Sequence, residues 1–559
     1  MSDILLCAIP KHGVNVPPLA LAYLQGLCKH YGYKVDVIDF NLELWENTIQ
    51  TDWWEVWKES NETLYKGKKF YLFYEDVYKK FIDSWARRIA DHPAKFVGIS
   101  CFSYRSLPTI KYLCPLIRKY NPNKKIIIGG SPVFNYYKWI LDNNYADYAV
   151  SNEGEKALLA ILDGRAKPGH VLLPQIENLN ALPKPDYTGL DFSKYVPGDP
   201  GGLKARRASY KRDRYEAGVM GSRGCVRRCS FCDVETFYPK FRWRSAENIY
   251  AEMLDLYKQG IDNIYFFDSL VNGNQKELEK LCDLIINDGS IFSSIKGLGI
   301  IKQMPERLYE KMNKANFKQI MVGIESFSPK LRKDMNKGFT DDLLKENLNL
   351  YAKYKINVPL LLIVGYPTQT EEDHLEEYRW MKENQHYAGN PVTRVEIGGT
   401  MLILPGAPVF KNKMYELFID KNKDWVSFPN GETNSMEVRI RRREEIERWA
   451  TEFGFTVGST YGEGGQMIGD PEKNNVADYE RPQDDLVSLY HADTDTDEDK
   501  EFKDYKYISR TDTLFPLSID LNEVQGDSIK TEQRKVWMKS YSKDAGLDVA
   551  LEVLKCWND

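Results

Sequence analysis

Over the first 160 residues, short runs that are apolar at nearly every position alternate with segments whose apolar residues recur at helical spacing. Strands that are apolar throughout are typical of parallel sheets covered by helices on both faces. The alternation of such strands with helices therefore predicts a Rossmann-like, doubly wound parallel sheet over residues 1–160. The five predicted strands lie at residues 4–10, 33–41, 95–102, 124–134 and 146–155.

The carboxyl ends of these strands are the places where such sheets bind ligands. In this sequence they fall at residues 10–18, 100–107, 129–133 and 151–155. The third of them reads GGSP, and two glycines allow a backbone to approach a flat ligand closely. On those four residues alone, a tight turn after the strand is the simpler interpretation.

An aromatic-rich insertion separates the second and third predicted strands, at residues 42–94. It contains Trp53, Trp54 and Trp57, whose spacing predicts helices with an aromatic face packed on the domain. A surface for a substrate or a partner is the alternative interpretation.

A second series of strand and helix patterns follows over residues 216–412. Ser245 is placed to cap the helix after the first of these strands, and Ser328 and Pro329 to open a short helix after the fourth. Repeated strand–helix units with right-handed connections predict a partial (β/α)6 barrel of the TIM type, with its chemistry at the carboxyl ends of the strands. The six strands are expected at residues 217–224, 263–270, 295–301, 317–326, 356–370 and 394–406.

The segments around the two units carry strong charge patterns. Residues 161–215 are predicted to be a linker that ends in the basic run KARRASYKRDRY, and residues 239–245 add further basic side chains. These could form a cradle for nucleic acid or an anionic substrate, or be a solvated linker with arginines paired to barrel carboxylates. Residues 413–559 predict an α/β or mostly helical C-terminal domain, in which residues 439–449 form an exposed helix with internal ion pairs.

Composition narrows the class of protein. The chain has 559 residues, 42% hydrophobic and 28% charged, which is typical of a soluble globular protein. No apolar run approaches the roughly 18 residues that a membrane span needs, and the first residues indicate a strand rather than a signal peptide. A net charge of -5 argues against a nucleic-acid partner. Nine scattered cysteines suit no disulfide framework, so we expect a cytoplasmic protein with reduced thiols.

The segment GSRGCVRRCSFCDVE places Cys225, Cys229 and Cys232 close together. In cytosolic proteins, thiols at such short gaps usually hold a metal. A structural zinc normally takes four protein ligands, whereas the next cysteine, Cys282, lies far downstream at a helical position. An iron–sulfur cube held by three thiolates would leave one iron free to bind a substrate or cofactor. Spacing alone favours that cluster and leaves open a zinc site completed by an Asp or His.

The pattern C-x-x-x-C-x-x-C, with Phe231 before the last cysteine, resembles the signature of radical S-adenosylmethionine (radical SAM) enzymes. The resemblance implies a [4Fe–4S] cluster whose open iron chelates the amino and carboxylate groups of S-adenosylmethionine (SAM). An electron, from a donor such as flavodoxin or ferredoxin, then cleaves SAM and releases a 5′-deoxyadenosyl radical.

Four later segments also resemble strand-end motifs of that family: FFDSLVN, VGIES, IVGYP and LILPGAPVF. The resemblance implies that Asp268 lies near the methionine end of SAM. It implies as well that Glu325 and Ser326 contact polar groups of SAM, and that Gly365 lies beside the adenine. The full set of residues expected at SAM is Phe231, Asp268, Gly323, Glu325, Ser326, Gly365 and Pro367.

The first 160 residues resemble the cobalamin-binding domain of B12-binding radical SAM proteins, through PPLALAYLQG, IIIGGSPVF and DYAVSNEGE. In methionine-synthase-like proteins an Asp-x-His-x-x-Gly motif supplies a histidine to cobalt. Here IPKHGVN has His12 but no aspartate two positions before it, so the sequence departs from that motif. The resemblance implies cobalamin at the strand ends, near Ser100, Gly129, Gly130, Ser131, Glu153 and Gly154.

Together the resemblances imply cobalamin-dependent methylation of an unactivated carbon of a small molecule, or a similar radical modification. The alternative is an oxidative cyclisation or rearrangement, with the first domain as a cofactor-free docking or substrate-binding module. Methylthiotransferases carry a second cluster before the barrel, and Cys7, Cys28, Cys101 and Cys114 do not reproduce its arrangement. The sequence assigns neither the substrate nor a general base.

Overall fold

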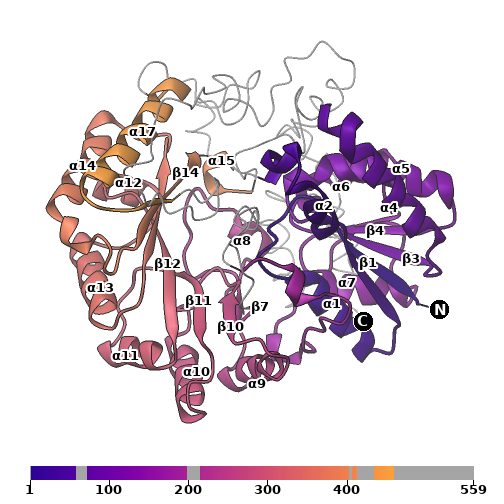
Figure 1. Cartoon of the computed structure of the whole chain (residues 1–559), viewed down its shortest axis with the longest axis horizontal. Coiled ribbons are helices and arrows are strands. Elements are labelled where there is room, and N and C mark those ends of the chain that lie inside the picture. The colour runs from indigo at the N-terminus through magenta and orange to yellow at the C-terminus, as the bar shows by residue number, and fades with distance from the viewer. Residues whose placement is uncertain (1, 58–71, 198–214, 402–405, 412–433, 459–559) are drawn as a thin grey trace, which may run out of the picture.

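Two α/β units lie side by side in the protein, one indigo to purple and the other magenta to orange in Figure 1. The computed structural model describes residues 2–57, 72–197, 215–401, 406–411 and 434–458. The strands in these residues form a six-stranded sheet, a seven-stranded sheet and a two-stranded ribbon.

The N-terminal sheet is parallel throughout, in the order β2-β1-β3-β4-β5-β6. Alternate residues of β1 face opposite sides, so that Ile4 and Leu6 belong to one apolar cluster and Leu5 and Cys7 to another. The predicted parallel sheet, buried on both faces, is thereby confirmed. Its strands are β1 (Ile4–Ala8), β2 (Val35–Asp39), β3 (Phe96–Ser100), β4 (Lys125–Gly129), β5 (Tyr148–Val150) and β6 (Gly169–Val171).

Helices cover both faces of this sheet, as a doubly wound fold requires. Strand β6 was not predicted and lies inside the expected linker, because three residues are too few to show a periodic pattern. One face is covered by α1 (Leu19–His30) and α7 (Gly154–Leu162), the other by α4 (Lys79–Asp91), α5 (Leu107–Tyr120) and α6 (Val133–Asp142).

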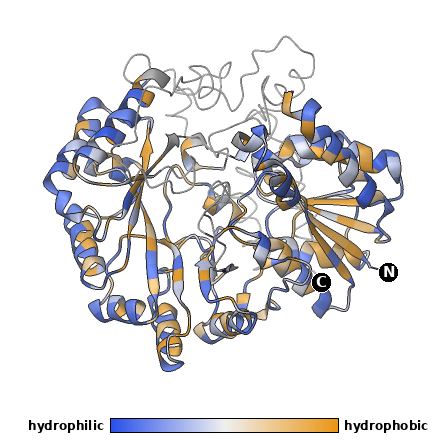
Figure 2. Ribbon diagram, viewed as in Figure 1, coloured by the Kyte–Doolittle hydropathy of each residue, from blue (hydrophilic) through white to orange (hydrophobic). Residues whose placement is uncertain are grey.

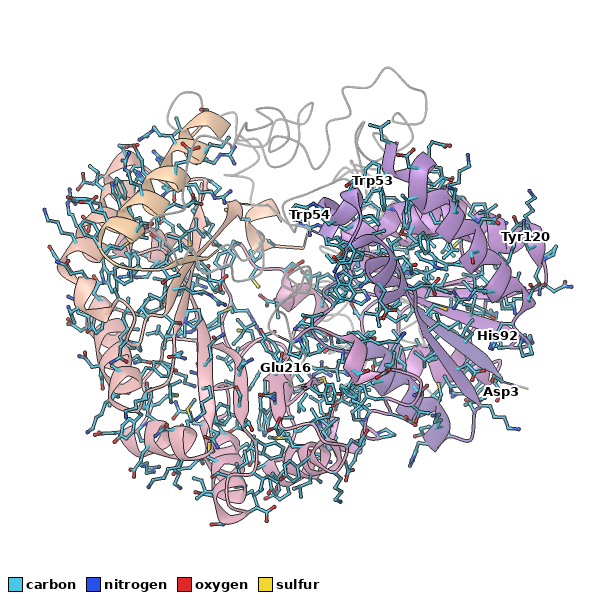
Figure 3. All side chains as sticks on the ribbon, in the orientation of Figure 1. Asp3, Trp53, Trp54, His92, Tyr120 and Glu216 are labelled. Carbon is cyan, nitrogen blue, oxygen red and sulfur yellow. The ribbon has the colours of Figure 1, made fainter. Side chains whose placement is uncertain are left out.

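The insertion packs aromatic side chains into the domain, as predicted. Trp45, Trp57 and Trp85 are fully buried in the core on that side of the sheet. Trp53 and Trp54 are half-buried on the side of the domain that faces the barrel (Figure 3). The elements of the insertion are α2 (Phe40–Thr48), η1 (Asp52–Trp57), η2 (Tyr74–Tyr78) and α4.

The second sheet is also parallel and runs in the order β7-β10-β11-β12-β13-β14-β15. It does not close on itself, since β7 and β15 form its two edges. The strands β7 and β10–β14 correspond to the six predicted strands, so the predicted partial barrel is confirmed. The two-residue strand β15 was not predicted. The strands are β7 (Glu216–Val219), β10 (Asn263–Phe266), β11 (Ser294–Gly299), β12 (Phe317–Glu325), β13 (Pro359–Val364), β14 (Arg394–Thr400) and β15 (Val457–Gly458).

Helices line the outside of this sheet (Figure 1). The Ser245 hydroxyl accepts a hydrogen bond from the Asn248 N–H (3.2 Å), and the Ser328 hydroxyl from the Leu331 N–H (3.3 Å), so both predicted helix starts are confirmed. The helices are α9 (Ala246–Tyr257), α10 (Gln275–Asn287), α11 (Glu306–Lys314), α12 (Pro329–Asp334), α13 (Asp341–Lys353) and α14 (Glu371–Glu383), with the short α15 (Pro408–Lys411) after β14.

Helix α17 (Met436–Glu452) packs on the barrel against α14. Its Arg439 and Arg442 are 0% and 1% exposed. Arg442 is held there because its Nη2 lies 3.1 Å from the carboxylate of Glu371 in α14. The expected internal ion pairs are present as well. The prediction of an exposed helix is nevertheless wrong, since basic side chains also pair across to another helix.

Helix α1 and the segment before the barrel cover the edge at which β7 has no strand partner. The Tyr187 hydroxyl donates to the carbonyl oxygen of Gly218 in β7 (3.0 Å). On α1, the Tyr23 hydroxyl donates to Glu252 of α9 (2.9 Å). Arg244 Nη1 donates to the same hydroxyl (2.8 Å) and lies 2.7 Å from Glu252. These buried polar contacts join the two units.

The two sheets distribute polarity differently (Figure 2). The N-terminal strands are apolar along their length, whereas the barrel strands are mixed. In β11, Ile295 packs in the core outside the barrel, so that Lys296 faces the inside. There its Nζ lies 2.8 Å from the carboxylate of Glu216, at the start of β7 (labelled in Figure 3). The inner face of the barrel is therefore polar at this end.

Candidate cluster and cofactor site

The three cysteines lie on a loop that follows the carboxyl end of β7. Cys225, Cys229 and Cys232 are each half-buried in it. The Cys232 N–H donates to the carbonyl oxygen of Cys229 (3.2 Å), and the Arg227 N–H donates to the sulfur of Cys225 (3.4 Å). The loop is framed by β8 (Ser222–Arg223), α8 (Val234–Phe237) and β9 (Arg242–Trp243), which pairs antiparallel with β8.

The environment of these thiols fits a metal that replaces their protons. Burial raises the pKa of the Cys232 thiol to about 12, and it also raises the pKa of Cys229. A thiolate at either position therefore needs a positive partner, which iron provides. Cys282 lies apart from them, buried in α10.

The spacing of the sulfurs bears on which metal fits. Among the described residues, one group of three side chains brings its ligand atoms within 4.8 Å of one another, and it consists of Glu371, His374 and Glu445. Cys225, Cys229 and Cys232 do not form such a group, so at least one pair of their sulfurs lies more than 4.8 Å apart.

An ion pair at the end of β12 lies beside the cysteine loop. Lys337 Nζ lies 3.0 Å from Glu325 Oε1 and 5.7 Å from the centre of the Phe231 ring. Burial, the largest single effect, would lower the pKa of Lys337, but the charge and hydrogen bond of Glu325 together with the thiols of Cys229 and Cys232 raise it. The charge of Lys337 also acts on Cys229. The predicted Phe231, on the cysteine loop, and the predicted Glu325 therefore both lie close to Lys337. No sequence pattern indicated Lys337.

Glu325 has an unusual backbone conformation. Its φ is +68°, in the left-handed region, and the pairing of β12 with β13 shifts register between Gly323 and Glu325. Such a conformation costs a non-glycine residue about 1–2 kcal/mol. A Cβ on Gly323 would lie 2.3 Å from Glu325 Oε1, so glycine leaves the room that the carboxylate occupies. Gly323 and Glu325 thus act as a pair.

Ser326 is turned into the protein. Its hydroxyl donates to Glu377 of α14 and accepts a hydrogen bond from the Ser328 N–H (3.0 Å). The Phe327 N–H donates to the other oxygen of Glu377 (3.0 Å). Burial raises the pKa of this carboxyl to about 7. Ser326 therefore has a positioning role at the end of β12, and its contact with SAM stays a prediction.

Asp268 fastens the start of the cysteine loop. Its Oδ1 accepts from the Gly221 N–H (2.6 Å) and its Oδ2 from the Ser222 hydroxyl (2.7 Å), and the residue is 3% exposed. The preceding Phe267 instead lies on the inner face of the barrel, where a Cβ on Gly218 would lie 2.4 Å from its ring. Asp268 thus points away from that face, and its placement at the methionine end of SAM stays a prediction.

We expect stability to fall as the pH rises from about 4 to about 7, in part through Asp268. Burial raises the pKa of its carboxyl from 3.8 to about 7, despite the hydrogen bond from Ser222. Between these values the folded protein keeps a proton that the unfolded chain has released. Raising the pH therefore favours unfolding, by up to about 1.4 kcal/mol per pH unit.

Urea unfolding at pH 5 and pH 8 measures this effect. The difference in unfolding free energy should shrink in Asp268→Asn and persist in Asp342→Asn, which changes an exposed carboxyl at the start of α13. An unchanged difference in Asp268→Asn contradicts the assignment.

The turn after β13 is covered by the C-terminal helix. Gly365 has φ +90°, and a Cβ there would lie 2.2 Å from Cδ of Arg439 in α17. The Tyr366 hydroxyl lies 2.8 Å from the hydroxyl of Ser230, which stands between two of the cysteines. Pro367 follows and is buried. The predicted glycine–proline turn therefore contacts both the cysteine loop and α17.

At the N-terminal sheet, the ends of β3 and β4 form a close backbone junction. Ser100 pairs with Gly129 in register, and the Ser131 hydroxyl donates to the carbonyl oxygen of Phe102 (3.2 Å). A Cβ on Gly130, with φ +128°, would lie 1.9 Å from the Cys101 carbonyl oxygen. Phe102 is 60% exposed beside this junction. A flat glycine backbone next to an exposed aromatic ring fits a large planar ligand such as a corrin.

Glu153, expected near the same ligand, also joins the two units, and its contact with cobalamin stays a prediction. Arg242 Nη2 donates to its Oε1 (2.6 Å), Arg223 Nη1 lies 3.0 Å from that oxygen, and the Ile176 N–H donates to Oε2 (2.7 Å). Burial alone would raise the pKa of Glu153, but these arginines hold it below its usual value. Gly154 opens α7 directly after it.

His12 has a hydrogen-bonding contact at one of its two ring nitrogens. Its Nδ1 lies 2.9 Å from the Gly13 carbonyl oxygen, and its Nε2 lies 3.7 Å from Asp39. Nε2 has no hydrogen-bond partner among the described residues.

Two family models match the chain, one on each unit. The model described as "Radical SAM superfamily" matches residues 219–381, and that described as "B12 binding domain" matches residues 7–162. The chain belongs to the radical SAM superfamily and carries a B12 binding domain. The radical SAM match includes the cysteine loop and the ends of β10, β12 and β13, and the B12 match includes the junction of β3 and β4.

Curated relatives resemble parts of the chain. An uncharacterized methyltransferase of Pyrococcus horikoshii is 26% identical over 281 residues, which are 46% of this chain and 58% of that protein. A putative methylthiotransferase of Methanocaldococcus jannaschii is 25% identical over 278 residues, 48% of this chain and 59% of that protein. The chain thus spans less than two thirds of the length of these relatives.

A solved structure shares the fold. It is the radical SAM methyltransferase TsrM of Kitasatospora setae with cobalamin and a [4Fe–4S] cluster bound, at a TM-score of 0.51 and 16% identity over 73% of this chain and 74% of that one. In the described part of this radical SAM protein, no helix is both long and apolar enough to cross a bilayer.

Proposed function

We propose that the protein is a cobalamin-dependent radical SAM methyltransferase that acts on a small molecule. The observation that carries the proposal is the buried junction at Glu153. This residue follows β5 at the carboxyl edge of the B12-type sheet, and it binds Arg223 and Arg242. Arg223 stands two residues before Cys225, and Arg242 is in the partner strand of the ribbon. The edge suited to cobalamin is thereby held against the loop suited to the cluster.

The candidate residues form two separate binding sites, one for the cluster and one for cobalamin. Cys225, Cys229 and Cys232 would hold the cluster, and the backbone of Gly129 and Gly130 would hold cobalamin. When bound, the cluster supplies the electron that cleaves SAM to a 5′-deoxyadenosyl radical, and cobalamin supplies the methyl group. We also propose a cytoplasmic location and a reduced flavodoxin or ferredoxin as the electron donor, in line with the free thiols of the described residues.

The surrounding side chains keep this arrangement fixed. Asp268 holds the backbone of the cysteine loop through Gly221, and Glu377 holds the end of β12 behind Glu325. Lys337 brings a positive charge next to Cys229, which favours the thiolate form. Asp268 therefore fixes the cysteine loop and Glu377 fixes the end of β12. The charge of Lys337 offsets part of the negative charge of a thiolate-bound cluster.

A methylthiotransferase is not favoured by the remaining cysteines. Cys7, Cys28, Cys101 and Cys114 are all buried, on β1, on α1, after β3 and on α5. Burial raises the pKa of each thiol. A cyclisation or rearrangement with a cofactor-free first domain remains the competing hypothesis.

Loading the full chain with iron, sulfide and cobalamin tests the proposal. We expect cobalamin to stay bound in stoichiometric amount after gel filtration, and reduced protein to convert SAM to both 5′-deoxyadenosine and S-adenosylhomocysteine. Phe102→Asp should lose the cobalamin, whereas Tyr31→Asp, at an equally exposed aromatic residue after α1, should keep it. Protein that forms 5′-deoxyadenosine but retains no cobalamin supports the competing hypothesis.

A further inference from the structure

Two basic side chains lie together at the mouth of the barrel, Arg227 and Lys302. Lys302 follows β11. Ile301 packs in the core outside the barrel, and Lys302 itself is half-buried. Lys302 Nζ lies 3.4 Å from the carbonyl oxygens of Asn272 and Gly273, which follow β10. Lys302 therefore stands at the carboxyl ends of two neighbouring strands.

Arg227 reaches the same place from the cysteine loop. Its Nη2 donates to the carbonyl oxygen of Ile301 (3.4 Å), the residue directly before Lys302. On its other side, a Cβ on Gly338 would lie 2.6 Å from Arg227 Nη1. The pKa of Lys302 is lowered by burial and, after that, by the positive charge of Arg227. The two cations are thus close enough to repel each other.

Neighbouring cations differ from this pair because they have acidic partners. Arg228 lies 2.9 Å from Glu235, and Lys337 lies 3.0 Å from Glu325. Over the ranges that the structure describes, no carboxylate lies within 4.0 Å of Arg227 or Lys302. Two like charges held together without a counter-charge are unfavourable, and an anion that binds between them relieves the repulsion.

An apolar surface lies at the adjacent strand end. Phe267 is 45% exposed on the inner face after β10, with its ring against Gly218. Its ring centre lies 5.0 Å from that of Tyr265, which lies on the same face. The mouth therefore offers a cationic pair and an aromatic surface on neighbouring elements. A ligand with an anionic group and an apolar body matches both.

We propose that Arg227 and Lys302 bind the anionic group of the substrate, a carboxylate or phosphate, while its apolar body contacts Phe267. This assignment rests on the proposed function, which it deepens by naming the class of substrate. SAM brings a carboxylate of its own, so a test must separate the substrate from SAM.

Calorimetric titration of the full chain, with its cluster assembled, tests the assignment with phenyl phosphate as the probe. We expect phenyl phosphate to bind and phenol, its uncharged counterpart, to bind far more weakly. Lys302→Met should weaken the binding of phenyl phosphate about tenfold or more, the effect of losing one charged hydrogen bond. Lys302→Arg should retain most of the affinity. Lys318→Met should retain all of it, because Lys318 contacts Asn316 at the opposite end of the barrel.

Titration with SAM decides between the two sources of the anion. The affinity for SAM should be the same in Lys302→Met as in Lys318→Met. A parallel loss of SAM affinity assigns the pair to the carboxylate of SAM and overturns the proposal. Equal binding of phenyl phosphate by Lys302→Met and Lys318→Met, or equal binding of phenol and phenyl phosphate, overturns it as well. Failure of the proposed function is seen separately, as an absence of 5′-deoxyadenosine from SAM or as a loss of cobalamin from the loaded protein.

Discussion

Replacement of Cys225 by alanine is expected to abolish the formation of 5′-deoxyadenosine from SAM. Two thiolates from the loop cannot hold a cube whose fourth corner must stay open for SAM. Cys229→Ala and Cys232→Ala should have the same effect, since each removes one of three ligands on the same loop. The measurement is the yield of the nucleoside from reduced, anaerobically reconstituted protein, together with its iron content and cluster absorbance.

Cys282→Ala is the matched control for these variants. Cys282 is buried in α10, away from the loop, and burial raises its pKa. Its loss leaves a small cavity and should cost about 1 kcal/mol of stability, with iron content and nucleoside yield unchanged. Formation of 5′-deoxyadenosine by Cys225→Ala at the rate of Cys282→Ala would rule out the three-thiolate cluster.

Replacement of Glu153 by alanine is expected to have the largest effect on stability. It leaves the buried Arg242 without its carboxylate partner, and it leaves the buried Arg223 with Glu155 alone. Breaking a buried pair by removing one partner typically costs 3–5 kcal/mol, about the size expected here. Urea unfolding gives this loss, and limited proteolysis of residues 172–197 reports whether the two units separate.

Glu177→Ala provides the comparison. Glu177 pairs with Lys240 at 3.2 Å, on side chains that are 72% and 68% exposed, and such exposed pairs contribute less than about 1 kcal/mol. Equal losses in the two variants would mean that the junction at Glu153 does not hold the units together.

The broad fold could be predicted because burial is recorded in the pattern of apolar residues. Strands such as Ile4–Ala8 are covered on both sides, so every position is apolar. Strands β6 and β15 have only three and two residues, too short for any periodicity to be seen. The helix α17 was predicted, but its burial was not, because Glu371, which binds its Arg442, lies far away in the sequence.

The site shows the same division between local and distant information. The spacing of Cys225, Cys229 and Cys232 is local, and so is the Gly323–Glu325 pair. Lys337 could not be found from the sequence, since the carboxylate that it binds becomes its neighbour only when β12 and α12 are in place. The directions of side chains after strand ends were equally hidden. The chain bends there, and the alternation of the strand no longer tells which side chain faces the mouth.

The contacts that cover the β7 edge have a consequence for how the protein can be divided. A fragment that begins at β7 would leave that strand without the hydrogen bond from Tyr187 and the cover of α1, and an uncovered strand edge is prone to aggregation. A fragment that ends before the barrel would leave Tyr23 without its acceptor, Glu252. Neither half is expected to be a well-behaved fragment for expression, so work on one cofactor will need point variants of the whole chain.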